Sequence, residues 1–181
     1  MQFKTWKTIK LGTGLKTGDD FRRALKEAGC GIAPGRSAQV NTILDGPTFK
    51  VAPKEIEVDL VNVSLAELGL PEGMIYDTWA TTSHRPGNQL YIHAQDLGLD
   101  LSPAEVGPQL CLQYLDQPIT KEMEFLNIGM EPVITTPGPS WKRVISIFMI
   151  YNDSGELGLM TTKGGNQPWS ASERFMFLKR K

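Results

Sequence analysis

The acidic residue with the clearest local context is Glu105, in the stretch Ser-Pro-Ala-Glu-Val-Gly-Pro at residues 102–108. As a general acid or base, Glu105 would need a partner within hydrogen-bond reach and a perturbed pKa. His93, Tyr114 and Asp116 are the residues that could join it. Together they would form a hydrolase-type enzyme whose site is assembled from dispersed residues, and this alternative stays open.

A structural role explains Glu105 without catalysis. Ser102 can cap a helix, Pro103 suits the first helical position, and Glu105 falls where its side chain reaches back to the cap. On this interpretation Glu105→Gln is nearly silent, whereas Ser102→Ala costs about 1 kcal/mol. Because a proline inside a helix costs about 3 kcal/mol, either the first turn ends at Gly107 or a new helix begins at Pro108.

The histidines, cysteines and serines of this chain are not spaced as they are in known metal-binding or nucleophile motifs. His84 and His93 lie nine positions apart, outside the usual metal-ligand spacings. Cys30 and Cys111 form no CxxC pair, and Cys111 between two leucines is typical of a buried apolar residue. No G-x-S-x-G sequence is present. We therefore predict no metal ion, no cofactor and no catalytic residue, and we leave enzymatic activity uncertain, leaning against it.

The stretch IKLGTGLKTGDDF has the layout of a phosphate-binding loop, with glycines between a strand and a helix start. The spacing of Gly12, Gly14 and Gly18 matches neither the dinucleotide-binding nor the Walker pattern. Asp19 and Asp20 in the first helical turn would also repel a phosphate. The pattern favours a plain connection between a strand and a helix.

Hydrophobic periodicity and capping signals predict one α+β domain over residues 1–181, with an N-terminal strand and helix, a helical middle and an antiparallel C-terminal sheet. We expect helices from Thr17 to Gly29, Ser37–Leu44, Ser64–Gly69, Met74–Thr82 and Gln89–Leu97. We expect strands at Phe3–Leu11, Phe49–Val51, Ile56–Val63, Glu122–Ile128, Val133–Ile134, Arg143–Tyr151, Leu157–Thr161 and Arg174–Leu178. The sequence from 143 to 161 is typical of a hairpin with a short Asp-Ser-Gly turn.

Charge divides the chain into a basic front, an acidic and largely helical middle, and a basic β-rich back. Residues 1–54 contain 10 lysines and arginines against 4 acidic residues, residues 55–131 contain 2 against 13, and residues 132–181 contain 7 against 3. Either these blocks attract one another within one fold, or the two basic ends meet to form an anion-binding face.

The segments WKTIKLGTGLKTGDDFRRALKEAG, GLDLSPAEVGPQLCLQYLDQP and FMFLKRK resemble a group of uncharacterised bacterial proteins. That group shares a Pro-Ala-Glu-Val-Gly-Pro core followed by Leu-x-Leu-x-Tyr, which Leu110, Leu112 and Tyr114 match here. Ser102 stands where the resemblance suggests a cysteine. No activity is attached to the group, so the resemblance implies no catalytic residue.

The sequence favours a non-enzymatic domain that binds a protein partner or its own copy. Aromatic residues in or beside loops, where binding residues concentrate, carry this prediction: Trp79, Trp141 and Trp169. The basic N- and C-terminal segments support the alternative, a nucleic-acid-binding accessory protein. The first segment contains Trp6 and Lys10, and the second ends in Lys179, Arg180 and Lys181. No apolar run approaches the roughly 18 residues of a membrane span, so we expect a cytoplasmic protein without membrane contact.

Overall fold

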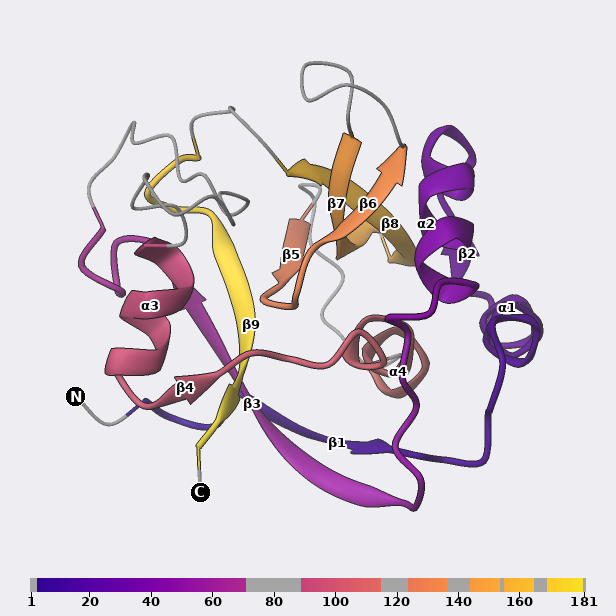
Figure 1. The fold of residues 1–181 in the computed structure, drawn as a ribbon, viewed down its shortest axis with the longest axis horizontal. Helices are drawn as coiled ribbons and strands as arrows, with labels where there is room; N and C mark the ends of the chain where they lie inside the picture. The colour runs from indigo at the N-terminus through magenta and orange to yellow at the C-terminus, as the bar shows by residue number, and fades with distance from the viewer. Residues whose placement is uncertain are drawn as a thin grey trace.

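A computed structural model describes residues 3–70, 89–114, 124–136, 144–153, 155–164 and 169–180 (Figure 1). Four features of the sequence lie outside these residues: the predicted helix Met74–Thr82, with Trp79 inside it, and the side chains of His84, Asp116 and Trp141.

The described strands form one mixed sheet, and each of the three charge blocks contributes strands to it. The strands are β1 (Lys7–Leu11), β2 (Gly31–Ile32), β3 (Ile56–Ser64), β4 (Leu99–Asp100), β5 (Glu124–Ile128), β6 (Val133–Thr136), β7 (Val144–Asp153), β8 (Glu156–Gly164) and β9 (Arg174–Lys179). Their order is β1-β3-β9-β5-β7-β8-β2, while β4 pairs with β9 and β6 with β7. The β5–β9 and β2–β8 pairs are parallel and the others antiparallel. The predicted α+β fold is thus confirmed.

The predicted hairpin near the C-terminal end is also confirmed. Strands β7 and β8 pair from Ile145 opposite Gly164 to Asp153 opposite Glu156 at the turn. Gly155 has φ of 95°, a left-handed conformation that glycine adopts without steric penalty. The turn therefore needs a glycine at this position.

The helices are α1 (Gly18–Glu27), α2 (Ser37–Leu44), α3 (Gln89–Asp96) and α4 (Val106–Gln113), with a short 3-10 turn η1 (Pro34–Arg36) before α2. Helix α4 packs against β1, β7, β8 and α1, and α2 packs against β6 and β8. In Figure 1, α3 lies to the left of β9, and α4, α2 and α1 lie to its right. None of the helices in the described ranges is long and apolar enough to cross a membrane.

Helix α1 begins as its sequence predicts. The Thr17 side chain accepts a hydrogen bond from the Asp20 N–H, and the Asp20 side chain accepts one from the Thr17 N–H, which completes a capping box. Phe21 and Leu25 are fully buried one turn apart, and Gly29 ends the helix with φ of 76°. Local signals therefore suffice to place this helix.

Three predicted elements differ in the structure. Phe49–Val51 is not a strand: the Phe49 N–H donates to the Gly46 carbonyl in a turn, and the Ala52 N–H that follows the segment donates to the Glu105 side chain. The first strand begins at Lys7 and not at Phe3. The predicted helix Ser64–Gly69 is not formed. The capping box of Ser64 and Glu67 is present, but the residues after Ser64 form a turn.

Candidate functional site

Glu105 lies in the interior, with 1 % of its surface exposed, and its carboxyl group binds two distant loops. The Gly12 N–H donates to Oε1 at 2.7 Å, and the Ala52 N–H donates to Oε2 at 2.8 Å. Gln109 Nε2 also donates to Oε1, at 3.2 Å. An ionised carboxylate only accepts hydrogen bonds, and all three partners are N–H donors. Glu105 therefore joins the loop after β1 to the loop before β3.

The predicted capping box at Ser102 is wrong. The Ser102 hydroxyl donates to the Met176 carbonyl at 3.0 Å, and its N–H donates to the Gly129 carbonyl at 2.8 Å. These bonds hold Ser102 against the sheet, so its side chain cannot cap α4. Glu105 itself occupies the position before α4 and makes no capping bond with its side chain.

Pro108 is the third residue of α4, which starts at Val106. Neither predicted alternative, an end at Gly107 or a start at Pro108, is correct. The first N–H groups of a helix have no partner within the helix, so a proline in this turn removes no helical hydrogen bond.

Three residues spaced four apart, Glu105 just before α4 and Gln109 and Gln113 within it, form a row that we call the α4 ladder. Gln109 Nε2 donates to the Thr13 hydroxyl at 2.7 Å. The Gln113 amide bonds both the N–H and the carbonyl of Lys10, at 2.8 and 2.7 Å. Gln113 Nε2 also donates to Gln109 Oε1 at 2.9 Å. The ladder thus attaches α4 to the end of β1 and the loop after it.

Gly12 lets the two loops held by Glu105 touch. Its φ is 67°, and a Cβ built on it would lie 2.3 Å from the Lys54 carbonyl oxygen. Beside this contact, the segments Gly12–Lys16 and Phe49–Pro53 enclose a cavity of about 350 Å³, which we call the loop pocket. The pocket is therefore shaped by backbone that the α4 ladder holds in place.

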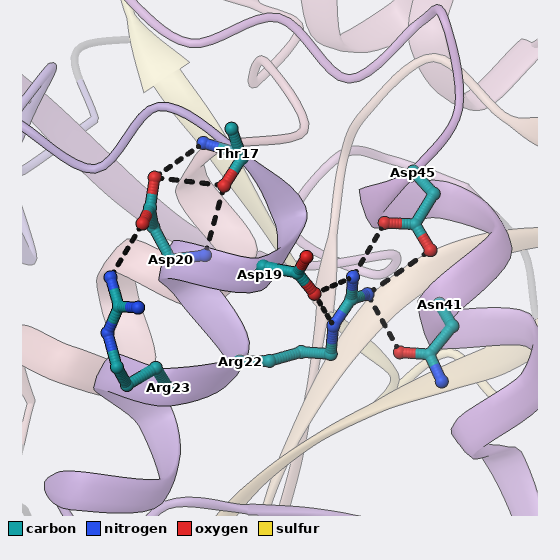
Figure 2. Close-up of polar contacts among 7 residues, drawn as sticks. All are labelled: Thr17, Asp19, Asp20, Arg22, Arg23, Asn41 and Asp45. Carbon is teal, nitrogen blue, oxygen red and sulfur yellow. Dashed lines mark hydrogen bonds and ion pairs between the residues drawn. The ribbon is translucent and has the colours of Figure 1, made fainter.

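The phosphate-loop layout does not produce a phosphate site at the start of α1. Asp20 Oδ2 accepts a hydrogen bond from the Lys16 N–H at 3.1 Å. It accepts another from the Thr17 N–H at 3.0 Å, which Figure 2 shows. The pKa of Asp20 falls to about 2, chiefly because Lys16 donates to its carboxyl group and then because Thr17 does so. The N–H groups that would bind a phosphate are thus occupied by the chain's own carboxylate.

On the outer side of α1, Arg22 connects this helix to α2 and the turn after it. Figure 2 shows its guanidinium group between Asp19 and Asp45, at 2.7 and 2.8 Å, with the Asn41 side-chain oxygen at 3.1 Å. The hydrogen bonds to Asp45 and Asp19 raise the pKa of Arg22. We call these four residues the Arg22 cluster.

Next to the Arg22 cluster lies the α1–α2 groove, with a volume of about 420 Å³. It is lined by Arg22, Leu25, Lys26, Gly29, Cys30, Gly31, Ile32, Ser37 and Asn41. Strand β2, which contributes Gly31 and Ile32, ends the strand order, so its far side has no partner strand in the described part of the sheet. The groove therefore borders a sheet edge.

The two cysteines are buried as predicted for Cys111. Cys30 Sγ donates to the Cys111 carbonyl at 3.3 Å, although 81 positions separate the residues. Burial raises the pKa of the Cys30 thiol, and it raises that of Cys111 well above its ordinary value. A thiolate is the reactive form of cysteine, so neither side chain is suited to nucleophilic catalysis.

The structure does not assemble the dispersed catalytic site from the residues it describes. The hydrogen bonds of Glu105 go to the loops and to Gln109. His93 is exposed on α3, which packs on β4. Tyr114 packs edge-on against Trp6 at 4.9 Å, with the Lys7 ammonium 4.6 Å from its ring centre. Within the described ranges, no group of three or more His, Cys, Asp or Glu residues could hold a metal ion.

The predicted binding residues are also separated. Trp169 is not exposed as expected: only 8 % of its surface is accessible, because its ring packs 5.1 Å from that of Phe175 in the core. Trp6 is half-buried against Tyr114. Lys10 is exposed but forms an ion pair with Glu55 at 2.8 Å. The groove and the loop pocket, which carry none of these side chains, are the sites that sequence reasoning missed.

The three charge blocks meet within the chain. Lys10 of the basic front pairs with Glu55 of the acidic middle. Arg180 of the basic back pairs with Asp100 at 2.6 Å, and Arg174 pairs with Glu67 at 3.2 Å. These contacts agree with the interpretation that the blocks attract one another inside one fold.

Comparison with known proteins finds no matching family model, no matching curated protein and no matching solved structure. The resemblance to uncharacterised bacterial proteins consequently stays a prediction, and the function must be argued from the structure.

Proposed function

We propose that the chain is a non-enzymatic binding domain whose α1–α2 groove takes an extended segment of a protein partner. The observation that carries this proposal is the position of the groove: an apolar hollow of about 420 Å³ borders the unpaired edge of β2. An extended peptide can add a strand to such an edge and place alternate side chains in the adjacent hollow.

The groove wall favours one apolar side chain of the partner, with acidic residues next to it. Ile32 supplies half-buried apolar surface, and the exposed Gly31 leaves the β2 backbone uncovered by a side chain. Lys26 is exposed at the rim and forms no ion pair with any described residue, so it can pair with a carboxylate of the partner. Arg22 already binds Asp19 and Asp45 and offers little further charge.

Self-association and nucleic-acid binding receive less support. Either function would use unpaired charge in the basic and acidic blocks, whereas Lys10, Arg174 and Arg180 each pair with an acid of the same chain. A groove that is mostly apolar is also a poor match for a phosphate backbone, which binds mainly through uncompensated cations. A separate protein partner therefore fits the surface better.

Selection from a random 12-residue peptide display library tests the proposal. We expect enriched peptides that combine one large apolar residue with neighbouring acids. Ser37→Trp fills the groove and should weaken their binding by about tenfold or more. Ala38→Trp, the adjacent exposed position that does not line the groove, is the matched control and should bind normally. A library that yields no enriched peptide, or peptides that bind Ser37→Trp as tightly as the wild type, contradicts the proposal.

A further inference from the structure

The loop pocket is a second cavity, and it shares no lining residue with the α1–α2 groove. Its walls are two irregular segments, Gly12–Lys16 and Phe49–Pro53, that lie far apart in the sequence. The proposed protein partner does not require this pocket, and its features point to a different ligand.

The pocket carries uncompensated positive charge. Lys16 and Lys50, one from each segment, are exposed in its lining, and neither forms an ion pair with a described residue. By contrast, Lys10, Arg22, Arg23, Arg174 and Arg180 all pair with carboxylates.

Two acidic side chains, those of Asp20 and Glu105, form hydrogen bonds with backbone N–H groups of the pocket walls. Asp20 accepts from the backbone of Lys16 and Thr17 and pairs with Arg23. Glu105 is buried beneath the two loops and accepts the N–H groups of Gly12 and Ala52. The mouth of the pocket therefore presents two ammonium groups to solvent, an arrangement that attracts an anion.

Part of the pocket lining is apolar. Leu15, Phe49 and Val51 are half-buried in its lining, and the Phe49 ring is fixed edge-on against Phe21 at 5.3 Å. An inorganic ion would leave these surfaces unused. A ligand with an apolar or aromatic body next to its charged group would cover them and gain the corresponding hydrophobic free energy.

The pocket walls are held before any ligand binds. Glu105 bonds one backbone N–H in each wall, and the Gln109 side chain bonds Thr13. Gly14, in the first wall, has φ of 98°, a left-handed conformation that favours glycine. Because the loops are already ordered, a ligand does not have to supply the free energy of ordering them.

From these features we propose that the loop pocket binds a small organic anion, a phosphate or carboxylate carried on an apolar or aromatic group. The charged group lies between the ammonium groups of Lys16 and Lys50. The apolar body contacts Leu15, Phe49 and Val51.

Amide chemical shifts of the full chain, recorded in 150 mM salt during titrations, test this proposal. The probes are phenyl phosphate, benzoate, inorganic phosphate and uncharged phenol. We expect saturable shifts at Gly14, Lys16 and Lys50 with phenyl phosphate or benzoate, and affinity about tenfold lower for inorganic phosphate and for phenol. Whichever of the two aromatic anions binds more tightly identifies the charged group.

Charge-reversal variants complete the experiment. Lys16→Glu and Lys50→Glu are surface changes, and each should weaken binding of the tighter aromatic anion by about tenfold. Lys26→Glu, in the α1–α2 groove, is the matched control and should leave it unchanged. The proposal is overturned if neither aromatic anion gives saturable shifts, or if the Lys16→Glu, Lys50→Glu double variant binds as the wild type does.

Discussion

The α4 ladder and the Arg22 cluster each use one charged side chain to join separate segments of the chain. The ladder does so in the interior, and the cluster does so near the surface. In the ladder, the Glu105 carboxyl group accepts three hydrogen bonds and ties two loops to α4, with 1 % of the residue exposed. In the cluster, the Arg22 guanidinium group bonds three side chains and ties α1 to α2 (Figure 2). There the Arg22 side chain is 27 % exposed, Asp19 85 % and Asp45 56 %.

The difference shows that burial, more than the number of bonds, sets the energetic importance of a charged contact. Water can replace the partners of an exposed ion pair, and such pairs contribute roughly 0–1 kcal/mol. Water does not readily take the place of a carboxyl group that is itself buried, so an N–H group that loses such an acceptor costs about 1–3 kcal/mol. Substitutions in the two regions should therefore have very different effects on stability.

The largest expected effect is that of Glu105→Ala, which leaves the Gly12 and Ala52 N–H groups without an acceptor. We expect a loss of about 4 kcal/mol in the free energy of unfolding, measured by denaturant titration. Glu105→Gln should cost about 2 kcal/mol, because the new NH₂ group faces a backbone N–H donor. The capping interpretation gave the opposite expectation, a nearly silent Gln substitution.

Glu67 supplies the control for this prediction. Its carboxyl group also accepts a backbone N–H, that of Ser64 at 2.7 Å, but its side chain is 53 % exposed. Glu67→Ala should cost less than about 1 kcal/mol. Equal losses for the Glu67 and Glu105 variants would break the comparison between buried and exposed contacts.

A slightly smaller effect is expected for Gly12→Ala, on the backbone side of the ladder. Alanine would have to adopt a φ of 67°, and its Cβ would overlap the Lys54 carbonyl oxygen. We therefore expect a loss of about 3 kcal/mol in the free energy of unfolding. Gly14→Ala has the same conformational strain but no contact within 4 Å and should cost only about 1–2 kcal/mol. If thermal and denaturant unfolding give the two variants equal stability, the close approach of the loops is not a constraint.

Arg22→Ala should lower stability by only about 0.5–1 kcal/mol, and this difference should shrink in 1 M salt, where exposed ion pairs are screened. Circular dichroism during urea unfolding at low and high salt provides the measurement. If Arg22→Ala lowered the free energy of unfolding as much as Glu105→Ala, the exposed Arg22 cluster would contribute as much to stability as the buried carboxyl group, contrary to the comparison.

The smallest effect concerns the pH dependence of Asp20, the half-buried carboxylate at the start of α1. Its pKa of about 2 lies below the ordinary 3.8, so its stabilising contribution is complete above about pH 4 and is lost as pH falls toward 2. Carboxyl chemical shifts recorded against pH measure the pKa directly. Arg23→Ala should change it little, because the Lys16 and Thr17 donors are its main cause. A pKa near 3.8 in the wild type would show that these bonds do not persist in solution.

The two regions also differ in how far the sequence predicts them. The capping box of Thr17 and Asp20 and the β7–β8 hairpin depend on neighbours in the chain, and the sequence predicts both. The partners of Glu105 lie 93 and 53 positions away, so local spacing suggested a helix cap that tertiary contacts replace. The spacing of Glu105, Gln109 and Gln113 did contain a usable signal, since residues four apart share one face of a helix.

Neither the α1–α2 groove nor the loop pocket could be predicted from local sequence patterns. Helices α1 and α2 were expected, but the groove between them also needs β2, a two-residue strand too short for a periodic pattern. The loop pocket is walled by irregular backbone, for which hydrophobic periodicity gives no signal. Its position follows from long-range contacts of α4 and not from the residues of its own walls.

Amide hydrogen exchange of Gly12 and Ala52, in the wild type and in Glu105→Gln, is the most direct test of the claim that one buried carboxyl group joins the two loops. The account predicts that both amides are protected in the wild type and that both lose protection together in the variant, while the Leu60 amide in β3 stays protected. If the two amides exchange freely in the wild type, or if their protection is unchanged when Glu105 is replaced, Glu105 does not hold the loops.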